Sequence, residues 1–264
     1  MLIRSAGEMA SGIAWCLYMA NLRRICMVDL DMPLCVRRTV AFCTALGSGS
    51  ASVEGVHAIA ARSGEDILAA WRDGYLAVMR VSDWQAVQQI RPAVVVDAII
   101  AKRNIATRIA DAPLVIGLGP GFVAGSDCHL VVETHRGHHL ARILERGSAQ
   151  PNTGTPGDIA GFTAERVLRA PRDGCFETRH VIGDRVSKGE VVGSVEGVTI
   201  TAGIDGIVRG LIGSGTVVTA KLKLGDIDPR GSIEHCHTIS DKARALGGAV
   251  LEAIMRHANR GLAA

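Results

Sequence analysis

A loop near the N-terminus combines glycines and small residues at the spacing of a phosphate-binding turn. Gly7, Ala10 and Gly12 follow the apolar residues 2–4 and open a helical pattern. A glycine at the turn lets a phosphate approach the backbone, and Gly12 allows close packing of the helix. Asp29 ends the next apolar run, 22 residues after Gly7, where a carboxylate can hydrogen-bond a ribose hydroxyl. The loop indicates a dinucleotide site, and a tight strand-to-helix turn without a nucleotide is the alternative.

Two further groups could bind the negative charge of the same ligand. Arg37 and Arg38 stand side by side after the second apolar run, and a guanidinium can hold a phosphate or carboxylate through two parallel hydrogen bonds. Gly117, Gly119 and Gly121 follow another apolar run, and the amides of such a loop can form an anion-binding nest. Arginines that merely solvate a loop are the alternative for the first group.

Residues 133–139 gather a carboxylate, three imidazoles and a guanidinium at the end of an expected strand. Arg136 is a candidate for binding the anionic ligand, and His135 is a candidate for a catalytic role. The stretch has neither the His-Glu-x-x-His pattern nor the Cys and His pairing typical of zinc, so we expect no metal site. Polar capping of the strand and helix ends is the alternative.

Cys236 stands between His235 and His237, a few residues before the helix-capping Ser240. A thiol near a helix N-terminus and beside imidazoles is expected to have a lowered pKa. Cys236 is therefore the candidate reactive thiol of the seven cysteines, and a buried, unreactive cysteine is the alternative.

The first 168 residues alternate short apolar runs with helical patterns, which is typical of parallel strands joined by helices. We expect an α/β domain over 1–168, a Rossmann-like parallel sheet with helices on both faces. The expected strands are 2–4, 25–29, 76–81, 94–100, 114–117 and 130–134, the expected helices are 9–21, 64–72, 83–90, 105–110 and 138–146, and 47–52 is expected to be a flexible loop.

Residues 169–228 have a different texture, with short Val and Ile runs separated by glycines. When 170–193 is moved by 32 positions onto 202–225, six residues are identical, four of them Asp or Gly that favour turns. Two copies of one all-β unit, each too small to bury a core alone, explain this pattern. The final segment, 229–264, contains an amphipathic helix from Ser240 that packs back on the first domain. Gly247 and Gly248 within it indicate close packing or a helix break.

The β segment resembles the lipoyl/biotinyl-like barrel-sandwich family through 183–190 and 205–208. The resemblance implies a small all-β barrel-sandwich hybrid. Carrier members of that family bear a modifiable lysine at the hairpin tip, and the corresponding residues 194–201 contain no lysine. We therefore expect a spacer, lid or docking surface rather than a carrier arm.

Composition excludes several classes of function. The 264 residues carry a net charge of +3 without a long basic run, which argues against nucleic-acid binding. No uncharged stretch reaches the roughly 20 apolar residues of a membrane span, and no secretory leader is expected at the start. Seven scattered cysteines without a Cys-x-x-Cys pair fit a reducing compartment. We expect a cytoplasmic protein, and the few aromatic residues fit either a large core or a homo-oligomer.

An ordered set of motifs along the whole chain resembles the accessory proteins encoded with selenium-dependent molybdenum hydroxylases. The matching stretches are 6–12, 33–38, 117–127, 133–138, 152–157, 223–230 and 239–254. The resemblance implies a role in the maturation of such a hydroxylase, with the hydroxylase or its cofactor-maturation proteins as partners. The cofactor would be a dinucleotide, NAD-like or molybdopterin dinucleotide, and selenium or sulfur delivery would be assisted. A non-catalytic scaffold that docks on the hydroxylase and a nicotinamide-dependent oxidoreductase are the alternatives.

Overall fold

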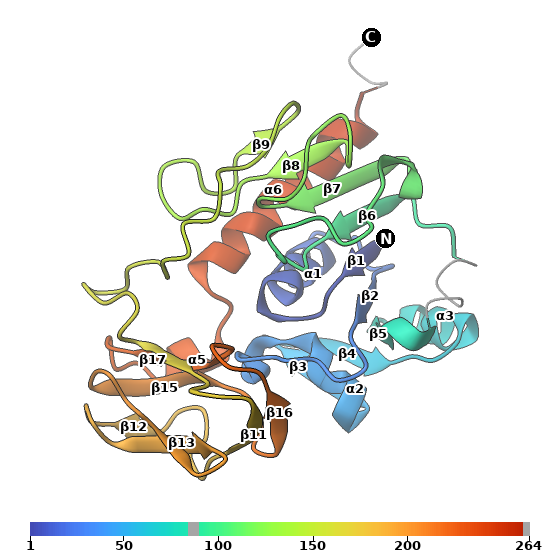
Figure 1. The fold of residues 1–264 in the computed structure, drawn as a ribbon. Coiled ribbons are helices and arrows are strands. Elements are labelled where there is room, and N and C mark those ends of the chain that lie inside the picture. The colour runs from blue at the N-terminus through green and yellow to red at the C-terminus, as the bar shows by residue number, and fades with distance from the viewer. Residues whose placement is uncertain (84–89, 261–264) are drawn as a thin grey trace. The chain divides into compact units, whose positions relative to one another are not determined.

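The computed structural model describes residues 1–83 and 90–260, which form two compact units (Figure 1). The first unit comprises Met1–Pro33, Ala41–Asn152 and Ile239–Ala264, and the second comprises Leu34–Val40 and Thr153–Thr238. The boundary expected between 168 and 169 lies inside the second unit, and the expected segment 229–264 is divided between the two units.

A nine-stranded mixed sheet forms the centre of the first unit. Seven neighbouring strands run parallel, and an antiparallel strand forms each edge. The parallel strands are short runs of Val, Ile and Leu that are buried on both faces, which is what a sheet covered on two sides requires. Across the sheet the order is β3 (Ser50–Val53), β4 (Val56–Ala60), β5 (Leu76–Arg80), β2 (Cys26–Asp29), β1 (Leu2–Arg4), β6 (Val94–Asp97), β7 (Leu114–Leu118), β8 (Leu130–Val132) and β9 (Ile143–Leu144).

The expectation of a Rossmann-like parallel sheet with helices on both faces is wrong. The sheet is mixed, because β3 and β9 run antiparallel to their neighbours. The expected helix over 105–110 is only a single 3₁₀ turn at Ile109–Asp111, and the stretch 138–146 contains β9 instead of a helix. The expected flexible loop at 47–52 contains the start of β3. The helix expected over 83–90 lies largely outside the described residues.

Few helices accompany the sheet. Oγ of Ser63 accepts from the amide of Asp66 at the start of α3 (Gly64–Arg72), and the Asp66 carboxylate accepts from the amide of Ser63, the arrangement known as a capping box. In the described part of the chain the helices are α1 (Glu8–Met19), α2 (Ala45–Ser48), α3 (Gly64–Arg72), α5 (Glu234–His237) and α6 (Asp241–Ala258), with 3₁₀ turns at Arg38–Val40, Phe42–Thr44, Val81–Asp83 and Ile109–Asp111.

Helices α1 and α6 pack side by side through glycines (Figure 1). A Cβ added to Gly12 would lie 2.7 Å from the Cβ of Ala243, and one added to Gly247 would lie 2.7 Å from the Cβ of Cys16. Residue 12 thus faces 243 and residue 16 faces 247, so the two helices run parallel. The pair of glycines at 247 and 248 does not break α6, which continues without interruption to Ala258.

Two four-stranded antiparallel sheets form the second unit. They enclose a core of aliphatic side chains with Phe176 as its aromatic member. One sheet has the order β10 (Val167–Arg169), β17 (Lys223–Asp228), β15 (Gly206–Leu211) and β12 (Arg185–Val186). The other has the order β14 (Val198–Thr201), β13 (Val191–Val195), β11 (Gly174–Glu177) and β16 (Thr216–Val218).

The 32-residue repeat of the sequence corresponds to an exchange of these two sheets. When 32 is added to their residue numbers, β10, β11, β12 and β13 coincide with β14, β15, β16 and β17, and the strand ends agree to within about two residues. The order β10-β17-β15-β12 becomes β14-β13-β11-β16 under the same exchange. Each sheet therefore contains two strands from each copy, and each copy depends on the other for its sheets.

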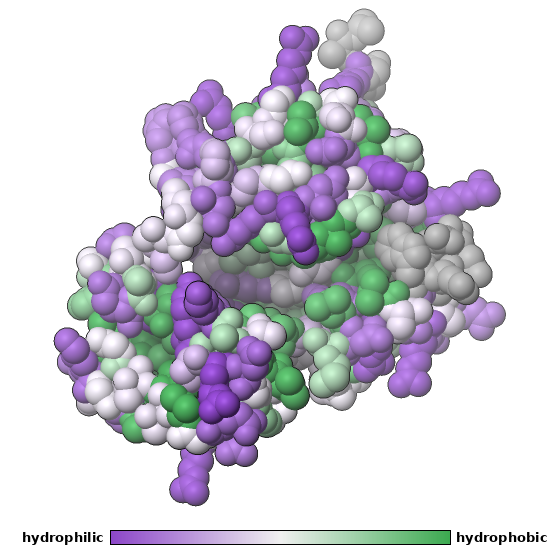
Figure 2. All heavy atoms as spheres, viewed as in Figure 1, coloured by the Kyte–Doolittle hydropathy of each residue, from purple (hydrophilic) through white to green (hydrophobic). Residues whose placement is uncertain are grey.

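The molecular surface alternates polar and apolar patches on the face drawn in Figure 2. Of the helices in the described ranges, none combines the length and hydrophobicity needed to cross a bilayer.

Candidate functional site

The polar candidates of the first unit lie at the carboxyl ends of the parallel strands. Because parallel strands all end at the same edge, the residues that follow β1, β2, β7 and β8 are brought to one side of the sheet. This edge holds the loop of Gly7, the carboxylate of Asp29, the loop of Gly119 and the stretch that contains His135 and Arg136.

Asp29 is used by the loop beside it. Its Oδ2 accepts a hydrogen bond of 2.5 Å from the amide of Ala6 and one of 3.3 Å from Oγ of Ser5. Ser5 has a φ of +94°, which is unfavourable for a residue with a side chain, and its Oγ also accepts from the amide of Gly7. These contacts fix the turn between β1 and α1, and they direct Oδ2 of Asp29 toward the loop instead of a ribose.

The N-termini of α1 and α6 lie level with each other at this edge. Gly7 is the N-cap of α1 and has no side chain to accept from the first-turn amides. Ser240 caps α6 by accepting from the amide of Ala243. Since the helices run parallel, the partial positive charges of the two N-termini add together in the same place.

Lys242 and Arg136 add cationic side chains beside the paired helix ends. Burial lowers the pKa of the Lys242 ammonium, and the positive charge of Arg136 lowers it further, while Glu8, Glu133 and Asp241 act in the opposite direction. The charged form of Lys242 is therefore less stable than that of a lysine in water, and a nearby anion would stabilise it. Sequence reasoning missed Lys242, which is the second residue after the N-cap Ser240.

Arg136 and His135 follow β8 at the same edge. Arg136 forms a two-pronged ion pair with Asp241 in the first turn of α6, at 2.9 and 3.1 Å. The backbone amide of His135 donates to Oε1 of the buried Glu133, whose Oε2 accepts from the amide of Gln150. Glu133 therefore holds the loop in shape, and nothing in the contacts of His135 identifies a catalytic role.

Close packing accounts for the glycines of the second loop. The amide of Gly119 donates to the carbonyl of Val132, so it is not directed at a ligand. A Cβ added to Gly117 would overlap the ring of Phe122, and one added to Gly121 would overlap the backbone of Arg103. Gly119 and Gly121 also have positive φ values of 80° and 106°, which glycine adopts without strain.

Apolar side chains are exposed on the loops that follow three of the neighbouring strands. Leu30 and Met32 follow β2, Val81 follows β5 and Ile99 follows β6, with exposed fractions between 38% and 84%. The amide of Ser82 donates to Asp31, which holds the first two loops together. An apolar rim beside a cationic centre suits a ligand that has both a ring and a phosphate.

The two adjacent arginines belong to the second unit, and their guanidinium groups bind backbone carbonyls. Arg37 is 3% exposed and donates to the carbonyls of His235 and Thr238. Arg38 donates through Nε to the carbonyl of Leu211 at 2.9 Å. Both arginines attach the segment 34–40 to the rest of the second unit.

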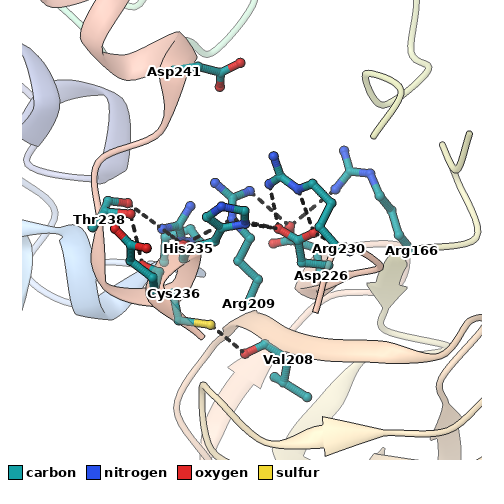
Figure 3. A network of polar contacts seen from close by, with 12 residues as sticks. Arg166, Val208, Arg209, Asp226, Arg230, His235, Cys236, Thr238 and Asp241 are labelled. Carbon is teal, nitrogen blue, oxygen red and sulfur yellow. Dashed lines mark hydrogen bonds and ion pairs between the residues drawn. The ribbon is translucent and has the colours of Figure 1, made fainter. Parts of the chain in front are cut away.

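Cys236 is buried, and its environment is the opposite of the one expected for a reactive thiol. Its Sγ lies 3.8 Å from the carbonyl of Val208, to which the thiol donates (Figure 3). Burial raises the pKa of Cys236 in spite of the nearby positive charges of Arg37 and Arg209. The expectation of a lowered pKa is therefore wrong, because α5 is a single turn that leaves the thiol inside the fold.

Two buried aspartates on β17 organise a network of ion pairs in the second unit. Asp226 lies 3.3 Å from Arg166, 3.7 Å from Arg209 and 3.2 Å from Lys223. Figure 3 shows the guanidinium groups of Arg166 and Arg209 directed toward the Asp226 carboxylate. The network joins β15 and the residue that precedes β10 to the interior strand β17.

Asp228 is the second carboxylate of this network. Arg230 binds both of its oxygens, at 2.9 and 2.6 Å, and Nδ1 of His235 lies 3.6 Å away. Burial raises the pKa of Asp228, but the hydrogen bonds and charge of Arg230, together with the charge of Arg209, outweigh it and lower the pKa to about 2. Across the described ranges, no group of three or more His, Cys, Asp or Glu side chains is arranged to hold a metal ion.

Comparison with known proteins gives a relative without an assigned function. No protein-family model matches the chain. The chain is 44% identical over its full length to the uncharacterized protein YqeB of Escherichia coli (strain K12), and it spans about half, 49%, of that relative.

Solved structures match only in part. A succinylglutamate desuccinylase/aspartoacylase from Rhodobacter sphaeroides is 29% identical over 24% of this chain and 22% of that one, with a TM-score of 0.23. The ectoine utilization protein EutE (DoeB) from Ruegeria pomeroyi is 21% identical over 33% of this chain and 28% of that one, with the same TM-score.

The predicted site residues thus fall into two groups. Gly7, Gly12, Asp29, Arg136 and His135 belong to the first unit with the three glycines of the second loop. Arg37, Arg38 and Cys236 belong to the second unit. Within the first unit, the paired N-termini of α1 and α6 with Lys242 offer a place for an anion, although Asp241 in the first turn of α6 already pairs with Arg136 and Glu8 lies in the first turn of α1.

Proposed function

We propose that this chain is an accessory protein in the maturation of a selenium-dependent molybdenum hydroxylase, and that the carboxyl edge of its nine-stranded sheet binds the phosphate of an anionic dinucleotide or pterin cofactor. The observation that carries the proposal is the parallel pairing of α1 and α6, which places two helix N-termini and the ammonium of Lys242 together.

Electrostatics favours a phosphate at this position. The N-terminus of a helix carries a partial positive charge and amides that lack a partner within the helix. Gly7 leaves the first-turn amides of α1 without a side-chain cap. A phosphate would also favour the charged form of Lys242, whose ammonium is partly desolvated. Binding at this position is therefore expected to raise the pKa of Lys242.

The rim of the same edge suits the ring of such a cofactor. Leu30, Met32, Val81 and Ile99 expose apolar surface on the neighbouring loops. The nicotinamide oxidoreductase alternative has less support, because the carboxylate of Asp29 is held by the amide of Ala6 and Oγ of Ser5. Selenium or sulfur delivery through Cys236 has no support from its burial and raised pKa.

The link to the hydroxylase rests on the ordered motifs of the sequence. Two of these, 6–12 and 239–254, are separated by more than two hundred residues and form the N-terminal ends of α1 and α6. Motifs that meet in this way at one edge of the sheet support a shared site more than motifs scattered over the surface would.

Calorimetric titration of the full chain with pyrophosphate, NAD and molybdopterin dinucleotide tests the cofactor site. At least one of the three should bind saturably. Lys242→Met should weaken that binding by about 10-fold to 100-fold, because a hydrogen bond to a charged group contributes roughly 1.5–3 kcal/mol. Lys188→Met is the control, since Lys188 is exposed in the second unit. Absence of binding by all three compounds, or equal effects of the two substitutions, would refute the cofactor site.

Co-purification with the hydroxylase tests the second half of the proposal. A tagged full chain should retain the immature hydroxylase in preference to the mature, cofactor-loaded enzyme. Equal retention of the two forms would contradict a role in maturation, whatever the outcome of the titrations.

A further inference from the structure

An open groove of about 830 Å³ lies on the second unit. Its floor is formed by β11 and β13 and by the residues that follow β11. The lining residues used below are Glu177, Thr178, Arg179, His180 and Ser194.

Because adding 32 to the residue numbers exchanges the two sheets of the second unit, the groove has an equivalent surface on the other sheet. Thr178 corresponds to Gly210, and Arg179 corresponds to Leu211. The groove on the sheet of β11 and β13 therefore corresponds to the surface beside the end of β15.

That equivalent surface is covered by the chain itself. The amide of Leu211 donates to the carbonyl of Val36 at 2.8 Å, and Arg38 donates back to the carbonyl of Leu211. The side chain of Val36 lies directly over Gly210, where an added Cβ would come within 2.7 Å of its Cγ1. The segment 34–40 is thus attached by main-chain hydrogen bonding and by one valine that contacts the core of the second unit.

The groove offers the same main-chain contact. Among the described residues the amide of Arg179 makes no hydrogen bond, whereas the equivalent amide of Leu211 donates to Val36. Arg179 is an exposed residue in the lining of the groove. Addition of an extended segment to such a backbone is a general mode of peptide recognition.

We propose that the groove binds an extended, basic segment of a partner protein, in the position that 34–40 occupies on the other sheet. The amide of Arg179 donates to a carbonyl of the bound segment. The groove and the cofactor edge share no residues, so either can exist without the other.

The lining predicts which side chains the segment carries. Thr178 stands where the other sheet has Gly210, and its larger side chain leaves room for a residue smaller than valine above it. Glu177 is exposed at the position of Arg209, so a negative charge stands where the other sheet has a positive one, while Arg179 adds one positive charge to the lining. Asp184 and Glu190 lie close to His180, at 3.2 and 3.7 Å. A small residue flanked by basic residues fits these features.

A labelled peptide gives a direct test. The probe has the sequence of residues 33–40 with serine in place of Cys35 and alanine in place of Val36, and its binding to the full chain is measured by fluorescence anisotropy. Saturable binding is expected. Arg179→Pro removes the amide donor and should weaken binding at least tenfold, whereas Arg179→Ala keeps the donor and should bind within about twofold of the unsubstituted chain.

Amide chemical-shift mapping keeps the test decisive if Arg179→Pro does not fold. The peptide should shift the amides of Thr178, Arg179 and Ser194 and leave those of Gly210 and Leu211 unchanged. Shifts confined to Gly210 and Leu211 would mean that the peptide only exchanges with the chain's own segment, and would overturn the proposal. Absence of binding would do the same. Concentration-dependent self-association that Arg179→Pro abolishes would assign the groove to a second copy of this chain, and would also overturn it.

Discussion

Substituting the two adjacent glycines of α6 separately tests the packing that holds the proposed cofactor edge together. Gly247 faces α1, where an added methyl group would lie 2.7 Å from the Cβ of Cys16 and 3.1 Å from the carbonyl oxygen of Gly12. Gly248 has no atom within 4 Å of the same position. Both lie in the interior of α6 without positive φ, so the intrinsic preference of the helix for alanine is the same at each site.

The expected free energies of unfolding follow from these contacts. Alanine in place of glycine in a helix contributes about 1 kcal/mol, so Gly248→Ala should stabilise the protein by that amount. At Gly247 the same gain is opposed by overpacking, which costs about 1–3 kcal/mol. Gly247→Ala should therefore range from neutral to about 2 kcal/mol less stable, and the two variants should differ by about 1–3 kcal/mol.

Thermal and denaturant unfolding of the two variants measure this difference. For a chain of this size, a change of 1 kcal/mol shifts Tm by about 2–4 °C. Gly248→Ala should have the highest Tm, and the Tm of Gly247→Ala should equal that of the unsubstituted chain or fall below it. Equal Tm values for the two variants would show that α6 does not approach α1 as closely as described, and the paired N-termini would lose their basis.

Three further outcomes follow from the pKa shifts. Asp228 has a folded-state pKa of about 2, below its ordinary value of 3.8, so its stabilisation is complete above pH 4 and is lost as the pH falls toward 2; acid titration of Asp228→Asn should show a smaller loss. Nδ1 of His129 accepts from the amide of Val115, and burial, aided by nearby positive charge, lowers the pKa of His129 below 6.5. Because the unfolded chain takes up this proton first, the free energy of unfolding should decrease as the pH falls below 6.5, and a His129→Asn variant with unchanged pH dependence would contradict this. Cys236 should resist iodoacetamide at pH 8 in the native chain and react on unfolding, as mass spectrometry of the labelled peptide would show.

Periodicity predicted six of the seven parallel strands and the three longer helices, but it missed β4 at Val56–Ala60. The runs that became β1, β2, β5, β6, β7 and β8 are short and rich in aliphatic residues, and α1, α3 and α6 show one apolar face. The two antiparallel edge strands were not predicted, because Ser50–Val53 is largely polar and Ile143–Leu144 is only two residues long.

Local polar contacts explain the helix that failed to form at 105–110. Thr107 donates through Oγ1 to the buried Asp97, and the side chain of Asn104 bonds both the amide and the carbonyl of Thr107. Such contacts compete with helical hydrogen bonds. Over 138–146 the chain pairs with β8 instead, and the amide of Ala141 donates to the carbonyl of Glu133.

The candidate site was only partly accessible from the sequence. The glycine loop and Arg136 are recognisable because their spacing is local. Lys242 acquires its role through the packing of Gly12 against Ala243, and no local pattern records a contact between segments so far apart. Arg37 and Arg38 have the residue types of an anion site, but whether a guanidinium meets a carbonyl or a ligand depends on the tertiary fold.

In the second unit, each copy of the repeat contributes two strands to each sheet. This arrangement limits how the unit can have arisen and predicts what happens when the chain is cleaved between the copies. A single copy has no complete sheet, so an ancestral chain of half the length would have had to fold as a pair of identical molecules before gene fusion joined them. Cleavage at the tight turn of Glu196 and Gly197 should accordingly leave two fragments that remain associated until they are denatured.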